Sequence, residues 1–489
     1  MTTKPVHAFT NDALGDHDAT GIAELIRSRE MRAEDAVRAS IARARKINPL
    51  LEAIEYEAFE KALEDARAPR DGVFGGVPTF VKDNADVGGM PARHGTLATT
   101  TRPCAKNGAF VSQFLQLGFT VLGKSRLPEF GFNATTEFSG RAPARNPWNT
   151  DCSTGGSSGG GSALVASGVV PIAHANDGGG SIRIPASCCG LVGLKPTRGR
   201  FIDGELARSL PVNIVGEGVV TRSVRDQARF FRGMEQAWRN GKLPEIGDVT
   251  GPGRKRLRIG LIVDSITGIP TCPETRRVID ETRALLEGLG HRVEPMPVPA
   301  PASFIDDFTL YWAFLAFSLG TFGKLLMSRD FDAGKFEPFS RGLASYFKKR
   351  MMRAPGMLYR LRRSFTWYER AMEGYDAVLT PVLSHRVAEL GYLHPDIEFD
   401  ELFRRLIAYV SFTPINNATG SPAITLPMGA DSRGVPLGVQ FMSGRGRERT
   451  LLELAFEIEE AHPWRKITGK AAGKGGRKAP VTRSKGRKK

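Results

Sequence analysis

The segments Gly155-Gly-Ser-Ser-Gly-Gly-Gly161 and Asp177-Gly-Gly-Gly-Ser-Ile-Arg-Ile-Pro185 are rich in glycine and each contains serine. Glycine at this density costs roughly 0.5–1 kcal/mol per residue in regular structure relative to alanine. Such segments persist where the backbone turns sharply or approaches a ligand closely. Three glycines before Ser181 leave a row of N–H groups without obstructing side chains, which suits an oxyanion hole beside a nucleophile. The two segments therefore predict a pair of catalytic loops.

A lysine lies upstream in an apolar stretch, Pro78-Thr-Phe-Val-Lys82-Asp83. Serine hydroxyls are weak nucleophiles at neutral pH and need a base within hydrogen-bond reach. A lysine serves as that base only when it is mostly neutral, and lowering its pKa from about 10.4 to about 7 costs roughly 4–5 kcal/mol. Burial beside apolar neighbours acts in that direction, and alternation along an extended segment turns Asp83 away from Lys82. Two serines and a desolvated lysine thus supply a nucleophile, a relay and a base.

The net charge of +16 is distributed unevenly along the 489 residues. Residues 465–489 contain eleven Lys or Arg and no acidic residue, which leaves the rest of the chain at about +5. This tail has too little apolar surface to fold, and we expect a disordered, solubilising terminus. Nucleic acid is therefore not an expected partner, although an anchor for nucleic acid or an anionic surface stays open as an alternative.

The five cysteines are odd in number and form no Cys-x-x-Cys pair, which favours buried thiols in a reducing, cytoplasmic setting. The first residues contain no apolar segment typical of secretion signals. No run of 18 apolar residues occurs, and the nearest candidate, residues 310–323, is predicted to be a buried helix too short to span a membrane. We expect no membrane span.

The hydrophobic pattern predicts a single large α/β/α domain with a mixed central sheet. Residues 18–69 are predicted to be helical with a break at Asn48-Pro49, and residues 169–173 to be a strand that leads into the second serine loop. Residues 300–372 have helical spacing with basic faces, for which packed helices with solvated outer faces are the favoured interpretation and a membrane-touching or substrate-covering cap the alternative. The predicted segments are a helical N-terminal cover at 1–70, a main domain at 71–460 with a variable cap near 295–400, and the basic tail at 461–489.

Together the two serine loops and the lysine segment resemble the amidase signature family of serine hydrolases. The spacings agree with that family, with 75 residues from Lys82 to Ser157 and 24 from Ser157 to Ser181. The resemblance extends over about residues 20–460. Further matching segments are Gly75–Pro78, Glu129–Gly131, Arg145–Trp148, Gly193–Thr197, Thr221–Asp226, Asn416–Ile424 and Gly434–Phe441.

The resemblance implies hydrolysis of a carboxylic amide, linear or cyclic, to carboxylate and amine without a metal or organic cofactor. It implies that Ser181 attacks the carbonyl to form an acyl-enzyme, that Ser157, after a cis peptide bond, shuttles the proton, and that Lys82 is the ultimate base. Residues implied to bind the developing oxyanion through backbone N–H groups are Gly178, Gly179, Gly180 and Ser181. Phe132 and Asn133 are candidates for the acyl pocket, with a structural role equally open. The expected partner is a small-molecule amide, and a homodimer is possible.

Two positions depart from the family, which commonly has Thr on both sides of the aspartate. Here Asn176 and Gly178 flank Asp177, a variant closest to bacterial amidases of the cyclic-amide and oligomer-hydrolase branch. Asp177 and Arg183 are expected to brace the loop through charge-assisted hydrogen bonds.

Three alternatives stay open at this point. Residues 156–160 approach the G-x-S-x-G elbow, with Ser158 as nucleophile and His385 or His394 as base. The family also includes the tRNA-dependent amidotransferase subunit, which acts on glutamine together with RNA-binding partners. A non-enzymatic nucleic-acid-binding protein would rely on residues 465–489.

Overall fold

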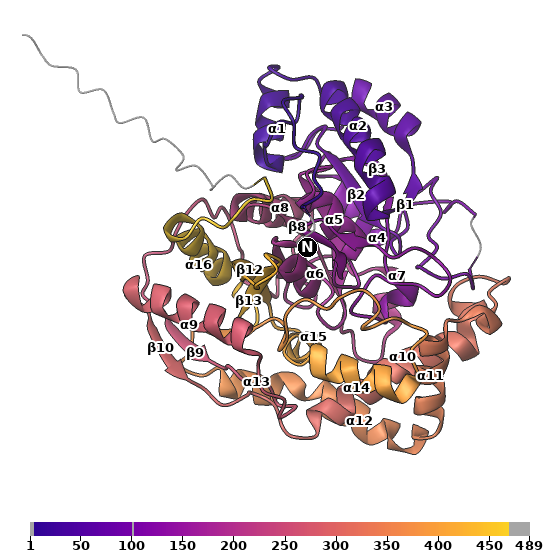
Figure 1. The fold of residues 1–489 in the computed structure, drawn as a ribbon, viewed down its shortest axis with the longest axis vertical. Helices are drawn as coiled ribbons and strands as arrows, with labels where there is room; N and C mark the ends of the chain where they lie inside the picture. Colours follow the sequence, from indigo (N-terminus) through magenta and orange to yellow (C-terminus); the bar gives the residue numbers. More distant parts are fainter. Residues whose placement is uncertain (1–3, 100–101, 469–489) are drawn as a thin grey trace, which may run out of the picture.

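A mixed eight-stranded sheet forms the centre of the computed structural model, which describes residues 4–99 and 102–468 (Figure 1). Its strands are β6 (Ile172–Asp177), β7 (Val192–Lys195), β8 (Gly216–Thr221), β9 (Arg258–Leu261), β10 (Arg292–Pro295), β11 (Ala377–Pro381), β12 (Ala423–Ala430) and β13 (Pro436–Met442). The strand order is β10-β9-β11-β13-β12-β7-β8-β6. β9 is parallel to β10 and β11, and the remaining neighbours are antiparallel. The predicted mixed sheet is confirmed.

Helices cover both faces of this sheet, as predicted. α8 (Val224–Ala237), α9 (Pro273–Gly288) and α16 (Glu448–Ala461) lie on one face, and α5 (Gly159–Ala166) and α6 (Arg183–Cys189) on the other. Successive residues of a strand point to opposite faces, so Val219 packs into the core under the first group and Val220 into the core under the second. The site loops precede α5 and α6 and therefore share one face.

A smaller sheet adjoins the large one at β6. It contains β1 (Ile54–Glu57), β3 (Thr120–Ser125) and β2 (Pro78–Lys82), in the order β1-β3-β2. The Thr79 hydroxyl of β2 donates to the Ile172 carbonyl at 3.0 Å, and the Lys82 backbone N–H donates to His174 Nδ1 at 3.2 Å. These bonds join β2 to β6, so Lys82 lies at the seam between the two sheets.

The N-terminal segment contains α1 (Ala19–Arg27), α2 (Ala33–Leu51) and α3 (Phe59–Arg67). The predicted break at Asn48-Pro49 is wrong, because α2 continues to Leu51. The Asn48 side chain accepts from the backbone N–H groups of Ala53 and Ile54 at 2.9 and 3.0 Å, which stabilises the chain just beyond this end. The segment also contains strand β1, whereas the hydrophobic pattern predicts only helices there.

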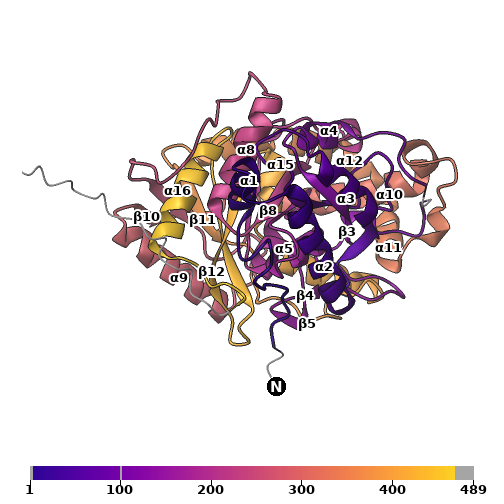
Figure 2. The same ribbon diagram turned by 90° about the horizontal axis from the view of Figure 1, so that it is seen from above.

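The remaining helices gather mainly in a cap, in which α10, α11 and α12 lie at the opposite end of the molecule from α9 and α16 (Figure 2). The cap helices are α10 (Phe304–Leu326), α11 (Pro338–Lys348), α12 (Ala354–Arg362), α13 (Ser364–Ala371) and α14 (Phe399–Tyr409). The other short elements are α4 (Ala109–Leu115), α7 (Glu205–Ser209), α15 (Pro414–Thr419), β4 (Arg145–Asn146), β5 (Asn149–Ser153), η1 (Glu129–Gly131), η2 (Ala333–Lys335) and η3 (Met351–Arg353). The division into domains stays a prediction.

Helix α10 is longer than the sequence predicted, with 23 residues in place of 14. It is long and apolar enough to cross a membrane by length and composition, but one such helix is weak evidence for a span. Here it is anchored to the protein, because the Tyr311 hydroxyl donates to the Val212 carbonyl at 2.6 Å and Arg360 pairs with Asp307 at 2.6 Å.

Two predicted boundaries need correction. β6 begins at Ile172 rather than Val169, since Pro171 cannot donate to a strand ladder. Residues 462–468 pack against the body instead of opening a disordered tail, and Trp464 Nε1 donates to the Arg222 carbonyl at 3.2 Å. Residues 469–489, which carry most of the basic tail, lie outside the described residues.

A buried ion pair ties α16 to the chain after β7 and gives the first prediction. Arg200 Nη2 lies 2.6 Å from Glu448 Oε2, and both side chains are almost fully buried. Arg200→Met leaves the Glu448 carboxylate buried without its cation, and we expect the free energy of unfolding to fall by about 3–5 kcal/mol in urea titrations. The double variant Arg200→Met/Glu448→Gln should recover part of the loss. A loss under about 1 kcal/mol for the single variant would show that Glu448 does not depend on Arg200.

Candidate active site

Lys82 and Ser157 are joined directly by a hydrogen bond at the seam between the sheets. Lys82 Nζ lies 2.8 Å from Ser157 Oγ and 2.7 Å from Asn176 Oδ1. Lys82 lies on β2, Ser157 in the loop before α5, and Asn176 on β6. Asn84 Nδ2 also approaches Asn176 Oδ1, at 3.4 Å, and Asn84 Oδ1 accepts from Asn176 Nδ2 at 3.0 Å. The amine is therefore held in one orientation, with Ser157 between it and the cavity.

Burial sets the protonation of this amine. Lys82 is fully buried, and desolvation lowers its pKa to about 7, against the opposing attraction of Glu217 and then Asp177. Asp83 faces away, as predicted, and lies 3.6 Å from Lys124 Nζ. Near neutral pH a large fraction of Lys82 is unprotonated and can accept a proton from Ser157.

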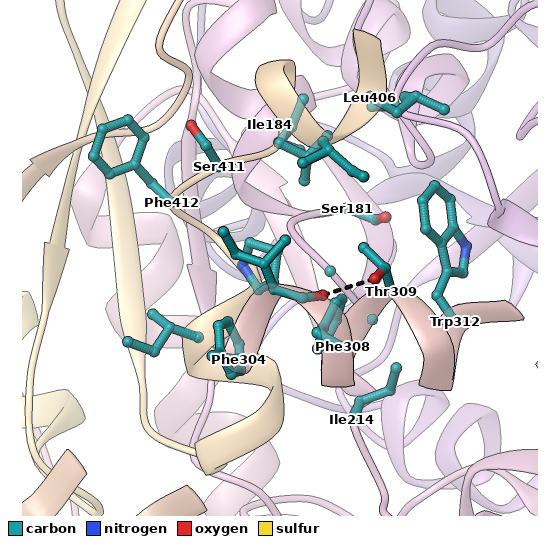
Figure 3. A pocket seen from close by; sticks show the side chains of 18 of the residues that line it. Ser181, Ile184, Ile214, Phe304, Phe308, Thr309, Trp312, Leu406, Ser411 and Phe412 are labelled. Carbon is teal, nitrogen blue, oxygen red and sulfur yellow. Dashed lines mark hydrogen bonds between the residues drawn. The ribbon is translucent and has the colours of Figure 1, made fainter. Parts of the chain in front are cut away.

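The two serines occupy one cavity but are not hydrogen-bonded to each other within the described residues. A cis peptide bond joins Gly156 to Ser157, as the resemblance implied. Ser157 is almost fully buried, whereas Ser181 is half-buried in the loop between β6 and α6. Both line the same cavity, and Ser181 is drawn there in Figure 3. A substrate carbonyl can therefore reach Ser181 while Ser157 stays beside the amine.

The predicted oxyanion donors are corrected at one position. The Gly180 N–H donates to Asp177 Oδ1 at 2.6 Å, so it is already satisfied. The N–H groups of Gly178, Gly179 and Ser181 have no acceptor within the described part of the chain. Gly180 has φ +133°, and a Cβ there would overlap Thr413, so only glycine fits. The available donors are thus Gly178, Gly179 and Ser181.

Asp177 and Arg183 hold this loop from beneath, as predicted. Arg183 Nε and Nη2 lie 2.9 and 3.0 Å from the two carboxylate oxygens of Asp177. Asn417 Nδ2 donates to the same carboxylate at 2.8 Å, and Gln440 Oε1 accepts from Arg183 Nη1 at 2.6 Å. Although burial opposes its ionisation, the Arg183 guanidinium and these bonds keep the pKa of Asp177 below its usual value.

The cavity is apolar and is covered by α10 (Figure 3). Its volume is about 1480 Å³ including the part open to solvent, and its described lining contains no Asp, Glu, Lys, Arg or His. The main apolar lining side chains are Ile184, Ile214, Ile262, Phe304, Phe308, Trp312, Leu315, Leu406, Val410, Phe412 and Met442. A charged substrate group would lose its hydration here without gaining an ionic partner.

Phe132 and Asn133, the candidates for the acyl pocket, line this cavity. Asn133 Nδ2 donates to the Leu393 carbonyl at 2.8 Å, which fixes the side chain. Asn133 Oδ1 is buried without a hydrogen-bond partner among the described residues. An unpaired buried acceptor is costly, so a donor on a bound ligand would satisfy it.

The structure disfavours the alternative nucleophile and identifies one residue that the sequence pattern did not assign to the site. The Ser158 hydroxyl donates to the Asn176 carbonyl at 3.2 Å, and neither His385 nor His394 hydrogen-bonds it. The unassigned residue is Asn176, whose side-chain amide hydrogen-bonds Lys82. The sequence marks it only as a departure from the family pattern, and that departure is the one sequence signal that could have pointed to it. Among the described residues no group of three or more His, Cys, Asp or Glu could hold a metal ion.

Comparison with known proteins places the chain in a family. The amidase family model matches residues 35–452. The putative amidase AmiC of Mycobacterium leprae is 47% identical over 94% of this chain and 98% of that protein. The 6-aminohexanoate-cyclic-dimer hydrolase of Paenarthrobacter ureafaciens is 33% identical over 91% of this chain and 95% of that protein. The chain therefore belongs to the amidase family and is an amide-hydrolysing enzyme.

Solved structures agree with this assignment. A structure of 6-aminohexanoate cyclic dimer hydrolase has a TM-score of 0.84 at 31% identity and covers 95% of this chain and 99% of that chain. A glutamyl-tRNA(Gln) amidotransferase subunit from Thermotoga maritima is a more distant neighbour, with a TM-score of 0.72 at 25% identity over 94% of this chain and 97% of that chain.

The brace beneath the Ser181 loop yields the second prediction. Arg183→Lys keeps a positive charge but cannot form the two-pronged contact with Asp177, so the loop loses its fixed position. We expect kcat/KM for an apolar anilide such as hexanoyl p-nitroanilide to fall about 100-fold. Circular dichroism would verify folding, and retention of more than half of the wild-type kcat/KM would contradict the assigned brace.

Proposed function

We propose that this enzyme hydrolyses amides through a seryl acyl-enzyme, with Ser181 as nucleophile, Ser157 as relay and Lys82 as base. The observation that carries the proposal is the 2.8 Å contact between Lys82 Nζ and Ser157 Oγ, beside a cavity that Ser157 shares with Ser181. The lowered pKa of Lys82 supports it, because only a neutral amine can accept a proton.

In the proposed mechanism protons move along one path in both directions. Neutral Lys82 takes the Ser157 proton while Ser157 takes the Ser181 proton, and Ser181 Oγ bonds to the carbonyl carbon. The N–H groups of Gly178, Gly179 and Ser181 would stabilise the oxyanion. The tetrahedral intermediate then breaks its C–N bond as the proton returns through Ser157 to the leaving nitrogen. Water repeats the sequence on the acyl-enzyme and releases the carboxylate.

The preferred substrates in this proposal are uncharged amides with an apolar acyl group. The uncharged, apolar lining of the cavity supports this, and Asn133 Oδ1 would accept an N–H from the substrate beside Phe132. Similarity to a 6-aminohexanoate-cyclic-dimer hydrolase supports cyclic amides as possible substrates. Glutamine is disfavoured, because neither its ammonium nor its carboxylate group would meet an opposite charge in the described lining.

Two further properties belong to the proposal. A cytoplasmic location is supported by five free cysteines, all within the described residues. A homodimer stays one possible assembly.

Nucleophile identity is testable by covalent labelling. A fluorophosphonate should label the wild type at Ser181. The Ser181→Ala variant should not be labelled, and its kcat for hexanoyl p-nitroanilide should fall at least about 10³-fold. Ser158→Ala is the matched control and should still be labelled. An adduct mapped to Ser158, or substantial turnover by purified Ser181→Ala, would refute the assignment.

The proposed base predicts a pH dependence. Because Lys82 is active when neutral and its pKa is about 7, log kcat/KM should fall with unit slope as pH decreases below about 7. Lys82→Met should abolish turnover while the protein remains folded. A rate that is independent of pH between about 5 and about 8 would contradict the role.

A further inference from the structure

A buried histidine and glutamate lie directly behind the proposed base. His174 is fully buried on β6, and its Nδ1 accepts the Lys82 backbone N–H at 3.2 Å. A ring nitrogen that accepts a hydrogen bond carries no proton, so the proton of neutral His174 is on Nε2. That nitrogen lies 3.0 Å from Glu217 Oε2 and donates to it. One side chain thus links the Lys82 backbone to a buried carboxylate.

His174 stays neutral in this arrangement. Burial lowers its pKa, against the opposing effect of Glu217, and Lys82 and Lys124 lower it further. A second proton on Nδ1 would also replace the acceptor of the Lys82 N–H with a donor. Glu217 is therefore held by an uncharged partner, and its negative charge is not cancelled.

Asp177, the other carboxylate that acts on Lys82, differs in this respect. It forms a two-pronged contact with Arg183, which offsets its charge. Within the described residues no Lys or Arg lies in salt-bridge distance of Glu217. Both carboxylates raise the pKa of Lys82 against the effect of burial, Glu217 more than Asp177.

Strand register places this carboxylate on the correct face. Glu217 on β8 pairs with Asn176 on β6, and directly paired residues of antiparallel strands share a face. His174 lies two residues before Asn176 and shares the same face. Glu217 from β8 and His174 from β6 lie on the Asn176 face beside Lys82, whereas Asp177 acts on Lys82 from the opposite face of β6. The titratable groups near Glu217 are Lys82, His174 and Asp203.

We propose that Glu217 is a positioning residue for amide hydrolysis, held by His174 so that one uncancelled carboxylate charge acts on the Lys82 amine from behind. This rests on the proposed role of Lys82 as base. The carboxylate favours the protonated amine and so offsets part of the effect of burial, which leaves Lys82 a stronger base than burial alone would allow. A stronger base that is still largely neutral near pH 7 accepts the Ser157 proton more readily.

The test compares pH profiles of kcat/KM for the full-length enzyme with hexanoyl p-nitroanilide. Glu217→Gln keeps an acceptor for His174 Nε2 but removes the charge, so the pKa of Lys82 should fall. We expect the acid limb to move to lower pH by about one unit, with a plateau rate reduced less than about tenfold. Glu217→Asp restores the charge and should return the limb toward the wild-type position.

Asp203→Asn is the matched control, because it removes a nearby carboxyl group that does not contact His174 or Lys82, and its limb should match the wild type. If Glu217→Gln does not fold, His174→Asn decides. The introduced asparagine can still accept the Lys82 N–H through its Oδ1, but it no longer holds Glu217. The acid limb of kcat/KM should again move to lower pH.

The outcomes separate the two proposals. Suppose that the wild type shows an acid limb of kcat/KM near pH 7 and that this limb keeps its position in Glu217→Gln. That result would overturn the role of Glu217 and leave that of Lys82 intact. His174→Asn replaces Glu217→Gln in this comparison if the latter does not fold. A wild type without any acid limb would overturn Lys82 as base and this inference with it. An equal shift in Asp203→Asn would show a general charge effect and would also overturn the role of Glu217.

Discussion

The desolvated amine of Lys82 is the constraint on which the rest of the site depends. Burial lowers its pKa to about 7, so the protein gives up several kcal/mol of charged-form hydration, of order 1.4 kcal/mol for each unit of pKa. That cost is useful only where a proton donor meets the amine, and Ser157 Oγ lies 2.8 Å away. A surface lysine would stay protonated and could not accept that proton.

The fold creates this environment at a seam. β2 belongs to the small sheet and β6 to the large one, and Thr79 and His174 join the two strands. The glycine-rich loops before α5 and α6 bring the serines to the same place, and the Asp177–Arg183 pair fixes the second loop. Helix α10 then lines the cavity with apolar side chains, and the described lining contains no charged side chain. Catalytic geometry and apolar specificity thus arise from different parts of the chain.

The sequence predicted the mixed sheet and its covering helices from local periodicity, and the meeting of Lys82 with Ser157 from the glycine-rich motifs and the family resemblance. It did not predict that the Gly180 N–H donates to Asp177, since loop torsions decide which amides remain free. Asn176 and Glu217 were missed because long-range contacts place them near Lys82: the packing of β2 on β6 brings Asn176 there, and the pairing of β8 with β6 brings Glu217. The proline signal at residue 49 did not end the helix, since α2 continues through Pro49 to Leu51.

The central claim is that Lys82 is substantially neutral near pH 7 in the folded enzyme. Nuclear magnetic resonance of the enzyme with ¹³C-labelled lysine, with the Lys82 signal assigned by its absence in Lys82→Met, measures this directly. We expect the Lys82 Cε signal to titrate with a midpoint near pH 7. A midpoint near the ordinary lysine pKa of about 10.4 would contradict it.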